Sequence, residues 1–218
     1  KPNKQKIILF TILALVIFIR PLKYFSYVAA GGLGYTPAEI NKQRYAPVFE
    51  WLRRNTKPDE VVFANNAMSV LIPIYTANNV FFQSLAGLHF MSNGEVQERF
   101  VLNNFWDTFN PTYAVANRFN IWGAYYPTLY DHNQSKNKIR SWFGLAKKEY
   151  VKYPPEAIDS FLRLAEKVQS QDFATQLKKY RVDYFVEDKK NARWPIDKLL
   201  FLKPVFQTDD LLIYEVIW

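Results

Sequence analysis

The chain has 218 residues, a formal net charge of +8 and no cysteine, and 17% of its residues are aromatic. This length suffices to bury a core of ordinary size, and the absence of cysteine excludes disulfide bonds and thiolate metal sites. The positive charge suits nucleic acid, an anionic membrane surface or a phosphorylated ligand, and the aromatic content favours a membrane among these. His89 and His132 lack the spacing of zinc ligands, so neither a metal site nor a cofactor is expected.

An apolar run over residues 7–19 dominates the N-terminal part of the chain, with lysines before it and Arg20 after it. The run is shorter than the roughly 20 residues of a typical spanning helix, but basic side chains at its ends can snorkel and residues 21–25 continue the apolar path. We therefore predict a transmembrane helix within residues 1–25; a buried core helix or the core of a signal peptide is the alternative. The lysines before the run favour a cytoplasmic N-terminus, which places the residues after about 25 outside the cytoplasm.

The next segment, residues 26–43, is predicted to be a linker to a folded domain over residues 44–218. It contains the sequence Gly-Gly-Leu-Gly, which superficially resembles a phosphate-binding loop. The motif lacks a following Gly-Lys-Ser/Thr and does not follow a strand, so a flexible linker is the better interpretation. The chain begins with Lys rather than Met, and we expect a fragment or a processed product.

The first part of the domain alternates between helical and strand periodicity. Apolar residues at helical spacing predict an amphipathic helix over residues 45–52, followed by a buried strand over residues 61–64. A second helix over residues 67–75 and a second strand over residues 80–82 complete the series. Helices and strands that alternate with short links predict a parallel α/β sheet.

A helical, aromatic-rich insertion is predicted at about residues 94–181. Its clearest helices are expected over residues 94–106 and 154–169, the second of which begins with two prolines. Nine aromatic residues occur between residues 105 and 130. This density is typical either of a stretch at the level of lipid headgroups or of an aromatic core, and the sequence favours neither.

Basic residues interleaved with aromatic residues follow this stretch. The residues predicted to contact a membrane or a phosphate are Lys136, Lys138, Arg140, Trp142, Lys147 and Lys148. Such a segment can bind anionic lipid headgroups, the phosphate of a lipid-linked substrate or single-stranded nucleic acid; the alternative is a solvated basic face. Asp131 adjoins His132 just before the segment, but adjacent residues rarely face one another, so a catalytic pair is not expected.

Three further strands are predicted near the C-terminus, over residues 182–187, 205–207 and 211–216. The last two flank a turn over residues 208–210 and form an antiparallel hairpin that closes one edge of the sheet. The predicted fold class is therefore α/β: an N-terminal transmembrane helix followed by a small Rossmann-like domain. Its sheet is expected to be mainly parallel, with the antiparallel hairpin at its C-terminal edge.

Five segments taken together resemble a known family. They are YAPVFEWLRRNTKPDEVVFANN, LIPIYTANNVFF, NGEVQERFVLNNF, KKYRVDYFVEDKK and LKPVFQTDDLLIYEV. The chain resembles the extracytoplasmic C-terminal region of polytopic membrane glycosyltransferases of the C superfamily, of the oligosaccharyltransferase or mannosyltransferase type. The resemblance implies sugar transfer from a polyprenyl-phosphate donor at the outer face of a membrane. It also implies that the catalytic acidic residues lie near earlier spanning helices, so no catalytic residue is expected in this chain.

The predicted ligand site lies beyond the carboxyl ends of the strands, where open α/β sheets bind their ligands. Its residues are Asn65, Asn66, Ser69, Gln83, Ser84, Glu187 and Asp188. For the two asparagines the alternative is a helix cap, because Asn at this position satisfies the first backbone N–H groups of a helix.

The resemblance implies a non-catalytic extracytoplasmic domain of a membrane glycosyltransferase-like protein, which assists the binding of an acceptor or of a polyprenyl-phosphate sugar. The expected partners are membrane lipid, a polyprenyl-phosphate-linked sugar and a glycan or protein acceptor. The alternative is a membrane-anchored interaction or scaffold module without a ligand pocket. A nucleic-acid partner would rest on charge alone, and the predicted membrane segment makes it unexpected.

Overall fold

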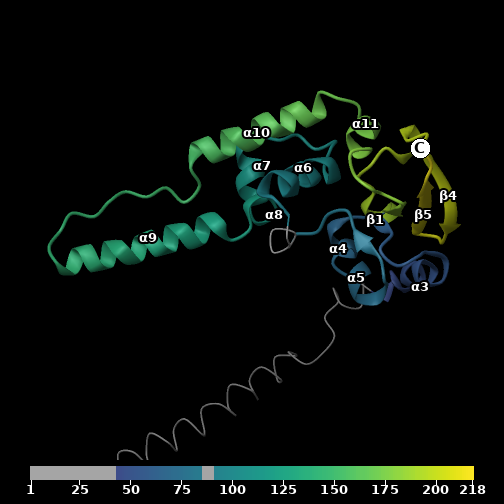
Figure 1. Cartoon of the computed structure of the whole chain (residues 1–218), viewed down its shortest axis with the longest axis horizontal. Helices are drawn as coiled ribbons and strands as arrows, with labels where there is room; N and C mark the ends of the chain where they lie inside the picture. Colours follow the sequence, from purple (N-terminus) through teal and green to yellow (C-terminus); the bar gives the residue numbers. More distant parts are fainter. Residues whose placement is uncertain (1–42, 85–90) are drawn as a thin grey trace, which may run out of the picture. The chain divides into compact units, whose positions relative to one another are not determined.

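The computed structural model describes residues 43–84 and 91–218, and the chain divides after Ala46 into two units. The second unit, Pro47–Trp218, contains the sheet and the helices that cover it (Figure 1). The spanning helix predicted within residues 1–25 lies outside the described residues, as does all but the last residue of the predicted linker. Among the helices that are described, none is both long enough and apolar enough to cross a membrane.

The sheet within the described residues has five strands in the order β2-β1-β3-β5-β4. Strands β2 (Asn79–Val80), β1 (Val61–Phe63) and β3 (Tyr184–Asp188) are parallel. Strand β5 (Leu211–Val216) runs antiparallel to both β3 and the edge strand β4 (Leu202–Gln207), so β4 has the direction of the first three. The predicted α/β class, with a mainly parallel sheet and an antiparallel C-terminal hairpin at its edge, is confirmed.

Helix α3 (Ala46–Asn55) precedes β1, and two short helices, α4 (Asn66–Ser69) and α5 (Ile72–Tyr75), connect β1 to β2. The prediction of one continuous helix over residues 67–75 is therefore wrong. The break has a simple cause in Pro73, whose ring cannot donate a backbone N–H and clashes with the preceding turn, so a helix begins anew around it.

Within the described residues, six helices lie between β2 and β3, in the region predicted as an insertion. They are α6 (Asn93–Asn103), α7 (Pro111–Ala116), α8 (Arg118–Trp122), α9 (Tyr125–Trp142), α10 (Pro155–Gln169) and α11 (Phe173–Leu177). Helix α10 packs along α6 and α7 (Figure 1). Two 3-10 turns, η2 (Lys189–Asn191) and η3 (Ile196–Lys198), follow β3.

The sequence pattern did not predict α9. Asn137 is the one buried residue among the 18 of this helix, so it has almost no apolar stripe to reveal its period. Pro127 lies in its first turn, where a proline costs least because the N–H groups there lack intrahelical acceptors.

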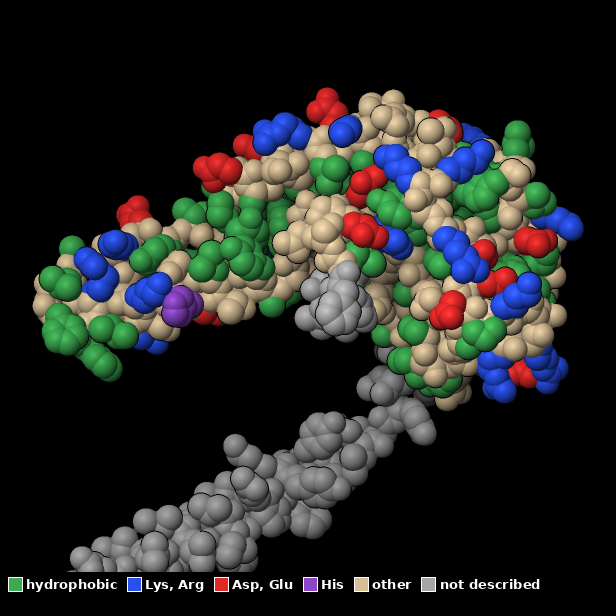
Figure 2. Space-filling view, in the orientation of Figure 1, with side chains coloured by type: hydrophobic (Ala, Val, Ile, Leu, Met, Phe, Trp, Pro, Cys, Tyr) green, Lys and Arg blue, Asp and Glu red, His purple; other side chains and the backbone are tan. Residues whose placement is uncertain are grey.

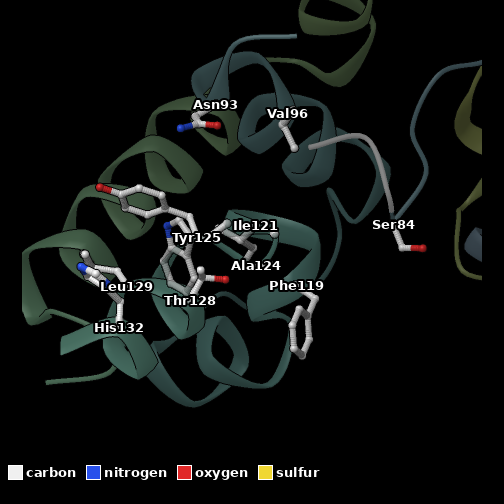
Figure 3. Close-up of a pocket in the computed structure, with 12 residues that line it drawn as sticks. Ser84, Asn93, Val96, Phe119, Ile121, Ala124, Tyr125, Thr128, Leu129 and His132 are labelled. Carbon is white, nitrogen blue, oxygen red and sulfur yellow. The ribbon is translucent and has the colours of Figure 1, made fainter. Parts of the chain in front are cut away.

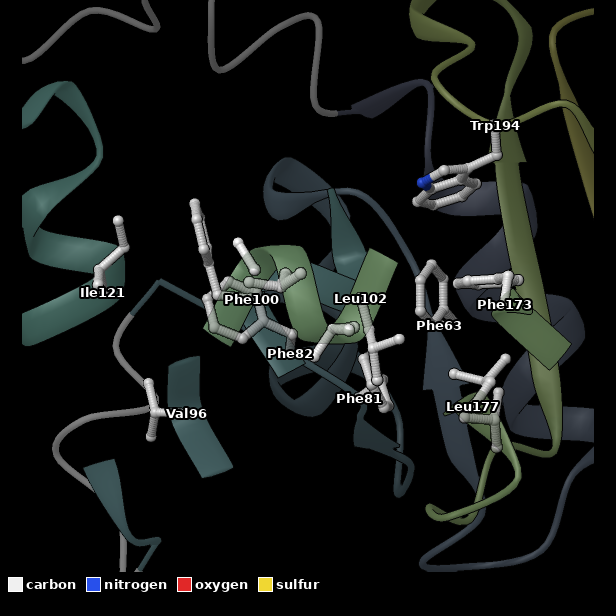
Figure 4. Close-up of a cluster of buried hydrophobic side chains, with 14 of the residues drawn as sticks. Phe63, Phe81, Phe82, Val96, Phe100, Leu102, Ile121, Phe173, Leu177 and Trp194 are labelled. Atoms are coloured by element: carbon white, nitrogen blue, oxygen red, sulfur yellow. The ribbon is translucent and has the colours of Figure 1, made fainter. Parts of the chain in front are cut away.

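The two faces of the sheet are covered by different parts of the chain. Helix α3 covers one face, where the Trp51 ring lies 5.8 Å from the Tyr184 ring and 6.0 Å from the Phe206 ring. Successive strand residues point to opposite faces of a sheet. Phe185, which follows Tyr184, therefore points to the second face, and the insertion covers that face. There Phe185 and Phe63 belong to the same buried cluster as Phe100 of α6 (Figure 4).

Phe63 lies at the centre of this cluster and is fully buried. Its ring stacks on Phe185 at 4.3 Å and on Phe81 at 4.9 Å, and the Trp194 indole meets it edge-on at 5.0 Å. Aromatic contacts of this kind stabilise a core beyond the area that they bury. Through these ring contacts, Phe63 of β1 packs against both β3 and the loop that follows β3.

The aromatic stretch between residues 105 and 130 divides between core and surface. Phe105, Phe109, Tyr113 and Trp122 pack against the buried cluster, as the core interpretation predicts. Phe119 and Tyr125 are instead exposed, by 53% and 62%.

Candidate functional site

Beyond the carboxyl end of β1, backbone carbonyls accept hydrogen bonds from side chains of the protein itself. The Ala64 carbonyl accepts from Ser69 Oγ at 3.1 Å and from Asn103 Nδ2 at 3.1 Å. The Trp194 Nε1–H donates to the Asn103 carbonyl at 3.2 Å. Because Ser69 is fully buried and its hydroxyl is used in this way, its position is that of a structural residue.

Two more of the predicted ligand residues stabilise local structure. Asn65 is the N-cap of α4, and its Oδ1 accepts from the Met68 backbone N–H at 3.0 Å. Asp188 is 2% exposed and accepts from the Lys190 N–H and from Asn191 Nδ2, which closes the 3-10 turn after β3. These contacts give both residues a structural role, and ligand binding by them stays a prediction.

The other predicted ligand residues are half-buried and do not share one cavity. Glu187 accepts a hydrogen bond from the Tyr214 hydroxyl at 3.0 Å and lines a groove of about 530 Å³. Burial raises the pKa of Tyr214, and the Glu187 carboxylate raises it further. Ser84 lines a different pocket, formed by the insertion, whereas Asn66 and Gln83 line neither. The role of these residues in ligand binding stays a prediction.

All six residues predicted to contact a membrane or phosphate lie at one end of α9. We call residues 136–148 the basic-aromatic tip. Its large apolar side chains point into solvent, since Trp142 is 83% exposed and Phe143 is 75% exposed. Figure 2 shows hydrophobic and basic side chains side by side at this end of the insertion. A large exposed apolar patch of this kind marks an interaction site.

The backbone of the tip is held in place by a helix-ending motif. The Leu145 N–H donates to the Arg140 carbonyl at 2.9 Å, and the Gly144 N–H donates to the Ser141 carbonyl at 3.1 Å. This pair of bonds is the Schellman motif, which needs a left-handed residue, and Gly144 has φ of +67°. The turn leaves Phe143 and Leu145 exposed on either side of the glycine.

A buried asparagine fastens the tip to the segment that follows it. Asn137 Nδ2 donates to the Lys148 carbonyl at 2.8 Å, and Asn137 Oδ1 accepts from the Lys148 N–H at 2.9 Å. The Arg140 Nε–H donates to the Ala146 carbonyl at 2.8 Å. The exposed side chains are thus carried by a fixed turn rather than by a free loop.

The charges of the tip are almost all of one sign. Within the described part of the chain, none of its four lysines forms an ion pair. Glu149 is the one acidic residue between residues 136 and 152. The tip therefore presents unpaired cations beside exposed aromatic rings, which suits an anionic partner with an apolar portion.

Sequence reasoning identified the cations of the tip and its aromatic residues Trp142 and Phe143, but it did not include Leu145. The signal was present, since Gly followed by an apolar residue is typical of a helix end. It was not used because α9 itself was not predicted.

Over residues 43–84 and 91–218, no group of three or more His, Asp or Glu side chains is placed to hold a metal ion. Comparison with protein-family models, with curated protein sequences and with solved structures found no match.

Proposed function

We propose that the chain is the non-catalytic extracytoplasmic domain of a membrane glycosyltransferase-like protein of the C superfamily. In this proposal residues 1–25 contain a spanning helix, the following domain is Rossmann-like, and the basic-aromatic tip contacts the membrane surface. There it assists the binding of a polyprenyl-phosphate sugar or of its acceptor. The observation that carries membrane contact is the exposure of Trp142, Phe143 and Leu145 on a fixed turn among unpaired lysines.

The chemistry of the tip matches that of a membrane–water interface. Tryptophan and phenylalanine side chains insert at the level of the headgroups, where their rings leave water. Each Lys or Arg near an anionic leaflet adds about 1 kcal/mol of attraction. The same cations suit the phosphate of a polyprenyl-phosphate sugar, so lipid and donor would be recognised by one surface.

Because the natural chain has no cysteine, a single cysteine can carry a label without background. The full chain with Leu145→Cys is labelled with an environment-sensitive NBD dye and reconstituted into vesicles. About 30% of the lipid in these vesicles is anionic phosphatidylglycerol. We expect a blue-shifted emission that is quenched by lipids carrying a doxyl group near the headgroup. Ser160→Cys on the exposed side of α10 is the matched control and should report water.

The test separates the proposed function from its alternative. A label at residue 145 that reports water in anionic vesicles, as the label at residue 160 does, would refute membrane contact. The membrane-anchored interaction module would then be the better proposal, with the exposed tip available to a protein.

A further inference from the structure

The insertion forms a pocket of about 740 Å³ that is separate from the tip. We call it the α8–α9 pocket. Figure 3 shows Asn93 and Val96 of α6 on one side, with Phe119, Tyr125 and His132 of α8 and α9 across from them. Small-molecule sites have volumes of roughly 300–1,000 Å³, so this pocket has the size of a ligand site.

One face of α9 lines the pocket. Tyr125, Thr128, Leu129 and His132 occur at the spacing i, i+3, i+4, i+7, which places them in one row along a helix. All four are exposed. The same helix thus carries two unpartnered surfaces, this row near its N-terminus and the tip at its C-terminus.

The aromatic rings of the pocket are held before any ligand binds. The Trp122 ring stacks on Tyr153 at 6.1 Å and meets Phe161 edge-on at 6.0 Å and Tyr126 edge-on at 5.8 Å. Tyr125 packs edge-on against Tyr126 at 5.0 Å while its own ring remains 62% exposed. Rings fixed in this way cost little entropy when a ligand stacks on them.

The polar groups of the pocket can donate or accept hydrogen bonds. Asn93 provides an amide, Thr128 a hydroxyl and His132 an imidazole, and all three are exposed. No Asp, Glu, Lys or Arg occurs among the described residues that line the pocket. The Arg118 guanidinium lies 4.9 Å from the centre of the Phe119 ring and donates to the Val115 carbonyl.

We infer that the α8–α9 pocket binds an uncharged saccharide. The C–H face of a sugar ring is apolar and stacks on aromatic rings, while its hydroxyl groups exchange hydrogen bonds with amides, hydroxyls and imidazoles. A charged ligand would lose hydration without finding an opposite charge on the lining side chains. A prenyl or acyl chain suits an enclosed apolar tunnel, whereas this pocket is open and edged by polar groups. The inference does not rest on membrane contact by the tip.

The experiment uses the full chain in lipid nanodiscs. A glycan array with neutral oligosaccharides of hexoses and N-acetylhexosamines, and with sialylated and sulfated glycans, identifies the preferred class. Saturation-transfer NMR with the best neutral glycan then measures its affinity and shows which ring protons lie against protein. We expect Tyr125→Ala to weaken binding by about tenfold, since 1.4 kcal/mol corresponds to a factor of ten and stacking on a fixed ring is of that size.

A matched control exists on the same helix. Trp142→Ala also removes an exposed aromatic ring from α9, but from the tip, and should leave saccharide affinity unchanged. His132→Ala tests a polar contact and should weaken binding without changing the melting temperature, because its side chain is exposed.

Three outcomes would overturn the inference: no neutral glycan binds, only acidic glycans bind, or farnesol binds in place of sugars and Tyr125→Ala abolishes that binding. Equal losses in Tyr125→Ala and Trp142→Ala would also refute it, because the ligand would then not be specific to the pocket. Each of these outcomes is independent of the label at residue 145, so failure here leaves the proposed membrane contact standing.

Discussion

Tyr180 shows how one residue of the insertion is tied to its neighbours. The Arg99 guanidinium lies 4.6 Å from the Tyr180 ring and 5.2 Å from the Phe81 ring, and it pairs with Glu95 at 2.8 Å. Burial raises the pKa of Tyr180 to about 12, with a further increase from the Glu98 carboxylate and a decrease from Arg99. The phenol is therefore held in its neutral form by the fold.

This pKa predicts a loss of stability in strong alkali. The ordinary value is 10.0, so the contribution of Tyr180 is fully present below pH 10 and is lost as the pH rises through about 12. We expect that subtracting the absorbance titration of Tyr180→Phe from that of the native chain leaves the ionisation of one phenol, with a midpoint near pH 12. Over the same interval the variant should lose less stability than the native chain. A difference curve centred near pH 10 would contradict the prediction.

At the scale of single elements, two glycines of the insertion have opposite roles. Gly144 has a positive φ and ends α9, whereas Gly94 lies in the first turn of α6 with no such backbone demand. A Cβ would meet nothing within 4 Å at either position, so a difference between them must come from the backbone and the unfolded chain.

We therefore expect opposite effects from the same substitution. Gly144→Ala forces an L-residue into the left-handed region and should destabilise the end of α9 by about 1 kcal/mol. Gly94→Ala should stabilise the chain by about 0.4–1 kcal/mol, because it restricts the unfolded chain. Hydrogen exchange of the Leu145 N–H reports the first effect and thermal unfolding the second. Similar effects of both changes would show that the helix-ending motif does not constrain the tip.

The elements that the sequence predicted well are those in which hydrophobic periodicity and the flanking turn or capping residues indicate the same boundaries. Helix α10 begins at Pro155 and buries Phe161 and Ala165 on one face, and β5 follows a turn of polar residues, so both were predicted at their observed positions. Helix α9 was missed because a projecting helix needs no apolar stripe. The tip was predicted from basic residues interleaved with aromatic residues, a pattern that is local in sequence.

The α8–α9 pocket could not be predicted in the same way. Most of its lining residues come from α6, α8 and α9, and the chain brings them together only through the packing of these helices. In the sequence its rings belong to a run of nine aromatics, four of which pack against the buried cluster. Topology also predicts a ligand site beyond the strands. There Asn103 Nδ2 donates to the Ala64 carbonyl and Trp194 Nε1–H donates to the Asn103 carbonyl, and ligand binding at this edge stays a prediction.

At the scale of the whole molecule, the net charge of +8 is less informative than where it lies. Replacement of the four tip lysines, Lys136, Lys138, Lys147 and Lys148, by Gln lowers the net charge to +4 (8 − 4). Replacement of Lys57, Lys167, Lys198 and Lys203, which are exposed elsewhere, has the same effect on net charge.

The two variants should differ in anionic vesicles. At about 1 kcal/mol for each lysine near the surface, the tip variant should lose most of the blue shift of the label at residue 145. The second variant should keep this blue shift. Salt at about 0.5 M should abolish the blue shift in both variants, because exposed charges are already screened at about 0.1 M. Equal behaviour of the variants would show that membrane contact depends on net charge and not on the tip.

Helix α9 also fixes the distance between the α8–α9 pocket and the basic-aromatic tip. His132 in the pocket and Trp142 at the tip are ten residues apart (142 − 132), which corresponds to about 15 Å along a helix that rises 1.5 Å per residue. If Trp142 rests at the headgroups, a saccharide tethered to the membrane must extend up to that distance before its outer rings reach His132. The spacing would select for chain length: a lipid carrying one sugar stays at the tip, whereas a longer glycan engages both ends of the helix at once.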